Sequence, residues 1–282
     1  MTKVVCALSG GGAKTAAHRG AVRALRETGL VPAHYVGTSM GAIIAAVLAA
    51  GCSLEEARRL LSDLRLRDLA APAPSALLGY FSRGLFRPGP FRRAVARLVP
   101  ARRFADLEVA LTITAVDTET GELALFGTGG RDDVPLVDAL YAACALPVYY
   151  PPAEIDGRRY VDGGVRAVLP LDTAARFAPD VVFAVDVGPS WRELPADGTT
   201  RVPPLVRQSG QVQRILMAAY AEEMLGRWAA RPVNADPELI LVQPPVRAET
   251  TFRLDLVGAY EADGYRTAAQ VLAERGARRD MP

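Results

Sequence analysis

Histidine and lysine are scarce in this sequence, which has two of each among 282 residues. Both histidines, His18 and His34, lie close to the start of the chain, whereas the common α/β-hydrolase triad places its histidine after the nucleophile and the acid. The order along the chain therefore argues against that triad for any nucleophile further along the chain. Because Lys3 and Lys14 are the only lysines, arginine supplies nearly all of the 33 basic residues.

Cysteine is also rare, and the three residues Cys6, Cys52 and Cys144 have no metal-ligand spacing. An odd number of widely separated cysteines favours reduced thiols of a cytosolic protein over a disulfide framework. No basic segment followed by an apolar stretch opens the chain. The longest apolar run, residues 42–50, falls well short of the roughly 18 residues typical of a membrane-spanning helix. We expect a cytoplasmic protein, with peripheral contact with a membrane left open.

The charges nearly balance, with a formal net charge of +2, so we expect no nucleic-acid partner. Strands and helices alternate along the chain without a polar linker, which predicts one α/β domain over residues 1–282. In this domain a mostly parallel sheet lies between two layers of helices, a three-layer α/β/α fold. The expected strands are residues 4–8, 34–36, 109–116, 122–126, 153–155, 158–161, 181–187 and 239–242. The expected helices are residues 16–28, 42–50, 53–65, 205–230 and 255–275, with two more beginning at Pro135 and Pro170.

Helix 205–230 is expected to be amphipathic, so that one face packs against the sheet. Its predicted buried stripe consists of Val212, Ile215, Leu216, Ala219, Met224, Leu225 and Trp228.

Glycine is concentrated after the first expected strand, in the run Ser9-Gly10-Gly11-Gly12-Ala13-Lys14-Thr15. One interpretation is the phosphate-binding loop of a nucleotide-binding protein, with residues 181–186 as a metal-binding strand. That match is poor, because the two glycines of the motif would fall on Leu8 and Ala13.

The second glycine motif, Gly37-Thr38-Ser39-Met40-Gly41, joins a strand to a helix. A Gly-x-Ser-x-Gly turn in this context is typical of a nucleophile elbow, in which small neighbours let strand and helix approach and the serine hydroxyl is exposed. The following helix offers free N–H groups to a developing oxyanion. The alternative is a simple turn with Ser39 as the helix N-cap.

The base that would activate Ser39 is not evident from the residues alone. His18 falls in a helix and His34 at the start of a strand, where a packing or a surface role is expected. A Ser–Lys pair would need Lys14 or Lys3, and Lys14 lies in the glycine loop. A carboxylate remains, and composition does not choose among those present.

These motifs, taken together, resemble the patatin-like phospholipases and most of all their bacterial members. The glycine loop and the elbow match two segments of that family. The later segments 142–147 and 156–161 look like the family's approach to a third, Asp162-Gly163-Gly164, which carries the catalytic aspartate. The three sites occur in the family's order, and the resemblance covers most of the chain.

The resemblance implies a patatin-like fold and a Ser–Asp dyad that works without histidine, metal or cofactor. Ser39 would be the nucleophile and Asp162 the general base. The oxyanion would be bound by N–H groups of residues 10–12 and of Met40. The implied oxyanion-hole residues are Gly10, Gly11, Gly12 and Met40, and the implied elbow and motif glycines are Gly37, Gly41, Gly163 and Gly164.

The implied function is hydrolysis of carboxylic esters of lipids, as in a phospholipase A, a lysophospholipase or an esterase. One position departs from the family, because Thr15 stands where its loop usually has glycine. If that position needs a positive φ, a β-branched residue is strained there and the loop is reshaped. A catalytically impaired protein that binds a lipid or another partner is therefore the alternative to an enzyme.

Residues 69–105 contain seven arginines and no acidic residue, with aromatic residues between them. Within this stretch, segment 79–104 suits contact with an anionic membrane, with arginines at the headgroups and aromatic rings at the interface. The alternative is a capping segment with solvated arginines. The two interpretations are equally favoured.

Overall fold

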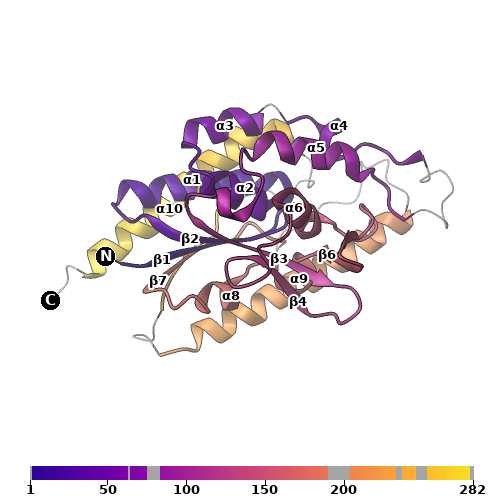
Figure 1. The fold of residues 1–282 in the computed structure, drawn as a ribbon. Helices are drawn as coiled ribbons and strands as arrows, with labels where there is room; N and C mark the ends of the chain where they lie inside the picture. Colours follow the sequence, from indigo (N-terminus) through magenta and orange to yellow (C-terminus); the bar gives the residue numbers. More distant parts are fainter. Residues whose placement is uncertain are drawn as a thin grey trace.

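The computed structural model describes residues 2–62, 64–74, 83–189, 204–232, 237–245 and 253–279. These residues form an eight-stranded sheet in the order β5-β6-β3-β2-β1-β7-β8, with β4 also paired to β3 (Figure 1). The strands are β1 (Val4–Leu8), β2 (Pro32–Thr38), β3 (Ala110–Asp117), β4 (Leu123–Gly127), β5 (Ala153–Ile155), β6 (Arg158–Asp162), β7 (Val181–Val185) and β8 (Glu238–Val242).

The five strands β3, β2, β1, β7 and β8 are parallel, and the antiparallel pairs lie at the β3 edge. Strands β1 and β7 are apolar at every position because helices cover both faces of the sheet. Val4, Cys6 and Leu8 of β1 enter one core cluster, while Val5 and Ala7 enter the other. The predicted three-layer α/β fold is confirmed.

Helices α1 (Ala16–Glu27), α2 (Met40–Ala49), α6 (Leu136–Cys144) and α10 (Val257–Arg279) contribute to the larger core on one face. Helices α8 (Leu171–Ala175) and α9 (Pro204–Ala229) cover the other face (Figure 1). Beyond the first layer lie α3 (Leu54–Ser62), α4 (Leu66–Leu69) and α5 (Pro88–Leu98). The remaining short elements are η1 (Gly12–Thr15), η3 (Phe104–Asp106), α7 (Gly164–Ala167) and η5 (Leu254–Leu256).

The register of β3 places the end of β6 beside the end of β2. Residues 112–114 of β3 pair with β2 on one side and with β4 on the other. Residues 115 and 116 pair with β4 and with β6, so β6 lies on the β2 side. Strand β6 therefore takes over as the neighbour of β3 where β2 stops.

Helix α9 departs from the predicted buried stripe. Met224 and Trp228 are buried as expected, but Val212, Leu216 and Ala219 are exposed. The second half of α9 packs against β7, whereas its first half contacts α7 and the loop after α6. Among the described residues, no helix combines the length and the apolar composition needed to cross a bilayer.

Candidate active site

Ser39 lies on a strained turn between β2 and α2. Its φ of 55° and ψ of −134° fall in a region that residues other than glycine rarely adopt. Helix α2 begins at the next residue, Met40, which is two residues earlier than predicted. The first N–H groups of a helix have no partner within it, so the serine hydroxyl and these donors share one end of the helix.

Gly37 and Gly41 let the backbone segments around Ser39 come into contact. A Cβ at Gly37 would lie 2.5 Å from Cα of Ala42, and a Cβ at Gly41 would lie 2.3 Å from the carbonyl oxygen of Ser9. Both distances are too short for any side chain, so larger residues would force backbone segments apart. The spacing of the elbow motif thus follows from the packing of α2 against the ends of β1 and β2.

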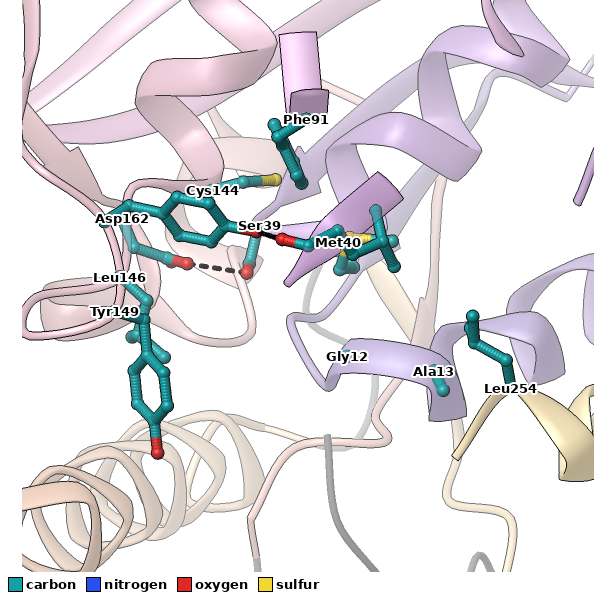
Figure 2. Close-up of a pocket in the computed structure, with 12 residues that line it drawn as sticks. Gly12, Ala13, Ser39, Met40, Phe91, Cys144, Leu146, Tyr149, Asp162 and Leu254 are labelled. Carbon is teal, nitrogen blue, oxygen red and sulfur yellow. Dashed lines mark hydrogen bonds between the residues drawn. The ribbon is translucent and has the colours of Figure 1, made fainter. Parts of the chain in front are cut away.

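Asp162, the last residue of β6, faces Ser39 from the other side of the cleft (Figure 2). Ser39 Oγ donates a hydrogen bond of 2.6 Å to Asp162 Oδ2. The second carboxylate oxygen, Oδ1, accepts a bond of 2.7 Å from the N–H of Gly164. With the N–H of Asp162 bonded to the carbonyl of Ala145, both the backbone and the carboxylate of the aspartate are fixed.

A pair of buried threonines supports the ends of β2 and β3 beneath this contact. Thr38 Oγ1 donates to the carbonyl of Ala167 at 3.0 Å, and the hydroxyls of Thr38 and Thr114 are 2.7 Å apart. Gly163 packs directly on Thr114, because a Cβ there would lie 2.4 Å from its Oγ1. The segment after Asp162 is therefore tied to the strand that precedes Ser39.

Burial raises the pKa of Asp162 to about 7, although the hydrogen bonds from Ser39 and Gly164 act in the opposite direction. The side chain is 1% exposed, so the carboxylate loses most of its hydration. An acid with a pKa near 7 exchanges a proton readily at neutral pH, which is the property required of a general base.

The predicted oxyanion loop lies next to Ser39, but its four residues are not equivalent. The N–H of Gly10 donates to the carbonyl of Val168 at 2.9 Å, so it is not available for an oxyanion, which corrects the expectation for that residue. Within the described part of the chain, the N–H groups of Gly11, Gly12 and Met40 have no backbone acceptor. Gly12 and Met40 line the same pocket as Ser39.

Thr15 does not carry the strain expected for a β-branched residue in this loop. Its φ is −61° and its ψ is −11°, which is right-handed helical geometry. Its hydroxyl donates a 2.7 Å bond to the carbonyl of Gly12 and so closes the η1 turn. The condition under which Thr15 would distort the loop is therefore not met, because the positive φ of the loop falls on Gly12.

Both histidines have packing roles, as the sequence predicts. Burial lowers the pKa of each to about 4, so both are neutral at pH 7. Nε2 of His18 lies 2.8 Å from the carbonyl of Ser9, which positions the start of the glycine loop. His34 contacts Thr112 and Phe177 at the opposite end of β2 from Ser39. Lys14 donates to the carbonyl of Gly188 instead of approaching Ser39.

The pocket around the two catalytic candidates is mostly apolar and draws on distant parts of the chain (Figure 2). Its remaining lining residues are Ala13, Leu69, Phe91, Cys144, Leu146, Tyr149, Tyr150 and Leu254. Sequence patterns alone did not assign any of these to the site. Three of them carried a signal from the resemblance: Ala13 falls in the glycine loop, and Cys144 and Leu146 fall in segment 142–147, which resembles the family's approach to the aspartate.

Part of the basic segment 79–104 turns inward. Residues 79–82 lie outside the described residues. Phe91 and Phe104 are buried, and Phe86 packs on Tyr149 and Tyr150. The expectation that these rings meet a membrane interface is therefore wrong for Phe91 and Phe104, which belong to the larger core; Phe91 also lines the pocket.

Comparison with known proteins shows the family to which most of the chain is similar. A family model described as patatin-like phospholipase matches residues 6–175. A Mycobacterium tuberculosis protein described as an uncharacterized NTE family protein is 33% identical over 190 residues, which cover 67% of this chain and 50% of the relative. Protein YqhO of Bacillus subtilis is 30% identical over 210 residues, covering 66% of this chain and 72% of the relative.

The chain spans about half the length of the mycobacterial relatives that it matches. Among solved structures, human GIVD cytosolic phospholipase A2 in complex with methyl γ-linolenyl fluorophosphonate has a similar fold. The TM-score is 0.50 at 13% identity, over 99% of this chain and 58% of the human chain.

Proposed function

This chain belongs to the patatin-like phospholipase family, and on that premise we propose that it is a serine acyl hydrolase of lipid esters that works through Ser39 and Asp162. The observation that carries the proposal is the 2.6 Å hydrogen bond from Ser39 Oγ to Asp162 Oδ2. Serine needs an adjacent base to become a nucleophile, and this carboxylate is the group that accepts its proton.

The first half of the reaction transfers the acyl group to the enzyme. Asp162 takes the proton of Ser39 as Oγ forms a bond to the ester carbonyl carbon. The resulting oxyanion is bound by the N–H groups of Gly11, Gly12 and Met40, which are donors without competing backbone acceptors in the described part of the chain. The bond from the carbonyl carbon to the alcohol oxygen then breaks, and the proton on Asp162 passes to the leaving alcohol.

The second half releases the acyl group. Asp162 accepts a proton from a water molecule, whose oxygen attacks the acyl carbon of the ester on Ser39. The carbon–Oγ bond breaks, Asp162 returns the proton to Ser39, and the carboxylic acid leaves. Each proton is held at Asp162 Oδ2, while Oδ1 remains bonded to Gly164.

An apolar acyl chain is the substrate feature that the pocket favours. Leu69, Phe91 and Leu254 line it together with the two tyrosines that follow Pro147. Burial of each methylene of an acyl chain in such a pocket is worth about 0.8 kcal/mol, so lipid esters gain binding energy that small polar esters lack.

The test is hydrolysis of p-nitrophenyl esters and of phospholipid vesicles by the wild type, Ser39→Ala and Asp162→Asn. Both variants are expected to lose activity by a factor of about 10³ or more. Ser53→Ala is a matched control, because the Ser53 hydroxyl caps α3 outside the pocket. A wild type that hydrolyses no ester but still binds lipid would support the binding-only alternative, which the geometry of Thr15 no longer motivates.

A further inference from the structure

Helices α4 and α5 separate two hollows in the surface of the protein. Leu69 and Phe91 line the pocket of Ser39, whereas their neighbours Ala70 and Pro90 line a second, open groove. The hydroxyl of Tyr150 donates to the carbonyl of Leu69, which fixes α4 to the catalytic side. The same two helices, α4 and α5, therefore line both the groove and the pocket of Ser39.

The groove has more positive than negative charge. Its charged residues are Arg67, Arg87, Arg93 and Asp68. Asp68 is already engaged, because its carboxylate accepts from Arg97 at 3.2 Å and from the N–H of Arg65 at 3.1 Å. The three arginines are exposed, and the described residues give their guanidinium groups no ion pair.

Short backbone pairing holds the two walls of the groove in place. The N–H of Arg87 donates to the carbonyl of Ala71 at 2.9 Å, and Pro72 forms an antiparallel bridge with Phe86. Arg93 follows one turn into α5, and its guanidinium lies over Gly89. Backbone pairing therefore fixes the two walls of the groove relative to each other, and with them the backbone at Arg87.

The uncharged part of the groove is apolar. It consists of Leu66, Ala70, Ala71, Pro72 and Pro90. Leu66 is 52% exposed, so its aliphatic side chain is open to solvent beside the charged residues of the groove. Guanidinium groups beside an exposed aliphatic residue match the chemistry of a phospholipid surface, where a phosphate lies next to the start of an acyl chain.

We propose that the groove between α4 and α5 binds the phosphate group of an anionic phospholipid in a membrane and thereby holds the Ser39 pocket against the lipid surface. Arg67, Arg87 and Arg93 bind the phosphate, and Leu66 enters the interface. The inference rests on the proposed function, because a lipid hydrolase meets its substrate in such a surface. It places the contact on Arg67 of α4, on Arg87 directly before α5 and on Arg93 of α5, and it excludes the buried rings of segment 79–104.

Binding is tested separately from catalysis, in a Ser39→Ala background that consumes no lipid. The readout is flotation with vesicles of phosphatidylcholine alone or mixed with phosphatidylglycerol. We expect binding only to the mixed vesicles, weakened by salt. Replacing Arg67, Arg87 and Arg93 by glutamine is expected to weaken it about 100-fold, at the usual contribution of an arginine near an anionic surface.

The matched control replaces three exposed arginines elsewhere, Arg159, Arg176 and Arg207, to which the described residues also give no ion pair, and removes the same net charge. This control is expected to bind nearly as the parent does. Equal losses in the two triple variants would overturn the proposal, since attraction would then depend on net charge alone. The proposal would also be overturned if the groove variant bound mixed vesicles as tightly as its parent, or if the parent did not bind mixed vesicles at all.

Two further measurements separate the remaining possibilities. Titration with inorganic phosphate is expected to show no binding at millimolar concentration, and saturable binding without vesicle binding would assign the groove to a free anion and overturn the membrane proposal. Hydrolysis of soluble p-nitrophenyl butyrate by the groove variant, with Ser39 intact, is expected to be unchanged. A wild type inactive on this ester would refute the proposed function, while the flotation result would still decide whether the groove binds the membrane.

Discussion

Thr38 and Asp162 pair with consecutive residues of β3, because Thr38 pairs with Thr114 and Asp162 pairs with Ala115. Ser39 follows Thr38 directly, so this register brings Ser39 to Asp162 across 123 residues of sequence. A parallel strand delivers the serine and an antiparallel strand delivers the aspartate to the same side of β3. The distance between the two side chains is therefore set by strand pairing and not by a flexible loop.

The first prediction concerns pH. Below about pH 7 Asp162 carries a proton and does not accept the proton of Ser39, because burial raises its pKa to about 7. We expect kcat/KM for a soluble ester to rise with pH through an apparent pKa near 7 and then to level off. A profile that is already flat at pH 5 would contradict the role of Asp162 as the base.

The raised pKa of Asp162 also predicts that this residue destabilises the fold. The pKa of Asp162 is higher in the folded protein than in the unfolded chain. Its contribution to the free energy of unfolding is therefore unfavourable once the pH exceeds the unfolded pKa near 4, and the destabilisation is complete above pH 7. Asp162→Asn keeps a carbonyl for Gly164 and is expected to gain about 2 kcal/mol of unfolding free energy at pH 8. Thermal unfolding at pH 8 and pH 5 checks this, since the gain should shrink at pH 5. A variant that is less stable than the wild type at pH 8 would refute it.

The two strand–turn–helix units at the start of the chain are predictable from sequence because their glycines are required by steric contacts with nearby residues. Gly37 and Gly41 are required by contacts within a few residues or at the adjacent strand end. The exposure of Val212 and Leu216 in α9 was not predictable from the sequence. Helical periodicity defines an apolar stripe, but it does not say whether a sheet packs against that stripe. The burial of Phe91 was unexpected for a related reason, since its arginine neighbours suggested a surface segment.

Thr15 gives a prediction on the glycine loop. Thr15→Gly removes the hydroxyl bond to Gly12 and adds backbone freedom at a position with φ of −61°. We expect a loss of about 1 kcal/mol in stability and no gain in kcat/KM. Thr28→Gly is the matched control, because Thr28 makes the equivalent bond to Leu25 at the other end of α1. A tenfold gain in activity of Thr15→Gly alone would show that threonine impairs the loop after all.

Phe91 is predicted to limit the length of the bound acyl chain. Its ring lies 5.2 Å from that of Tyr150, measured between centroids, and both line the pocket. Phe91→Leu is expected to raise kcat/KM for octanoyl relative to butyryl esters several-fold, at about 0.8 kcal/mol for each methylene newly accommodated. Phe104→Leu controls for lost core volume, because Phe104 is buried outside the pocket. Equal chain-length ratios in both variants would rule out this role.

Helix α10 lies beyond the residues that the family model matches, yet it packs backbone to backbone on α1. A Cβ at Gly264 would lie 2.0 Å from the carbonyl oxygen of Ala17, and a Cβ at Gly20 would lie equally close to the carbonyl oxygen of Glu261. Gly264→Ala must therefore separate the helices, at a cost of about 1–3 kcal/mol. At this chain length each kcal/mol corresponds to about 2–4 °C in Tm.

A second glycine of α10 separates packing from helix propensity. A Cβ at Gly276 would have no neighbouring atom within 4 Å, so Gly276→Ala gains only the higher helix propensity of alanine, about 0.5–1 kcal/mol, and should raise Tm. Opposite signs for the same substitution in the same helix would show that Gly264 is retained for close contact with α1. If both variants are stabilised, α10 does not pack closely on α1 in solution, and Tyr260 would then not hold Ala13 of the glycine loop as its packing indicates.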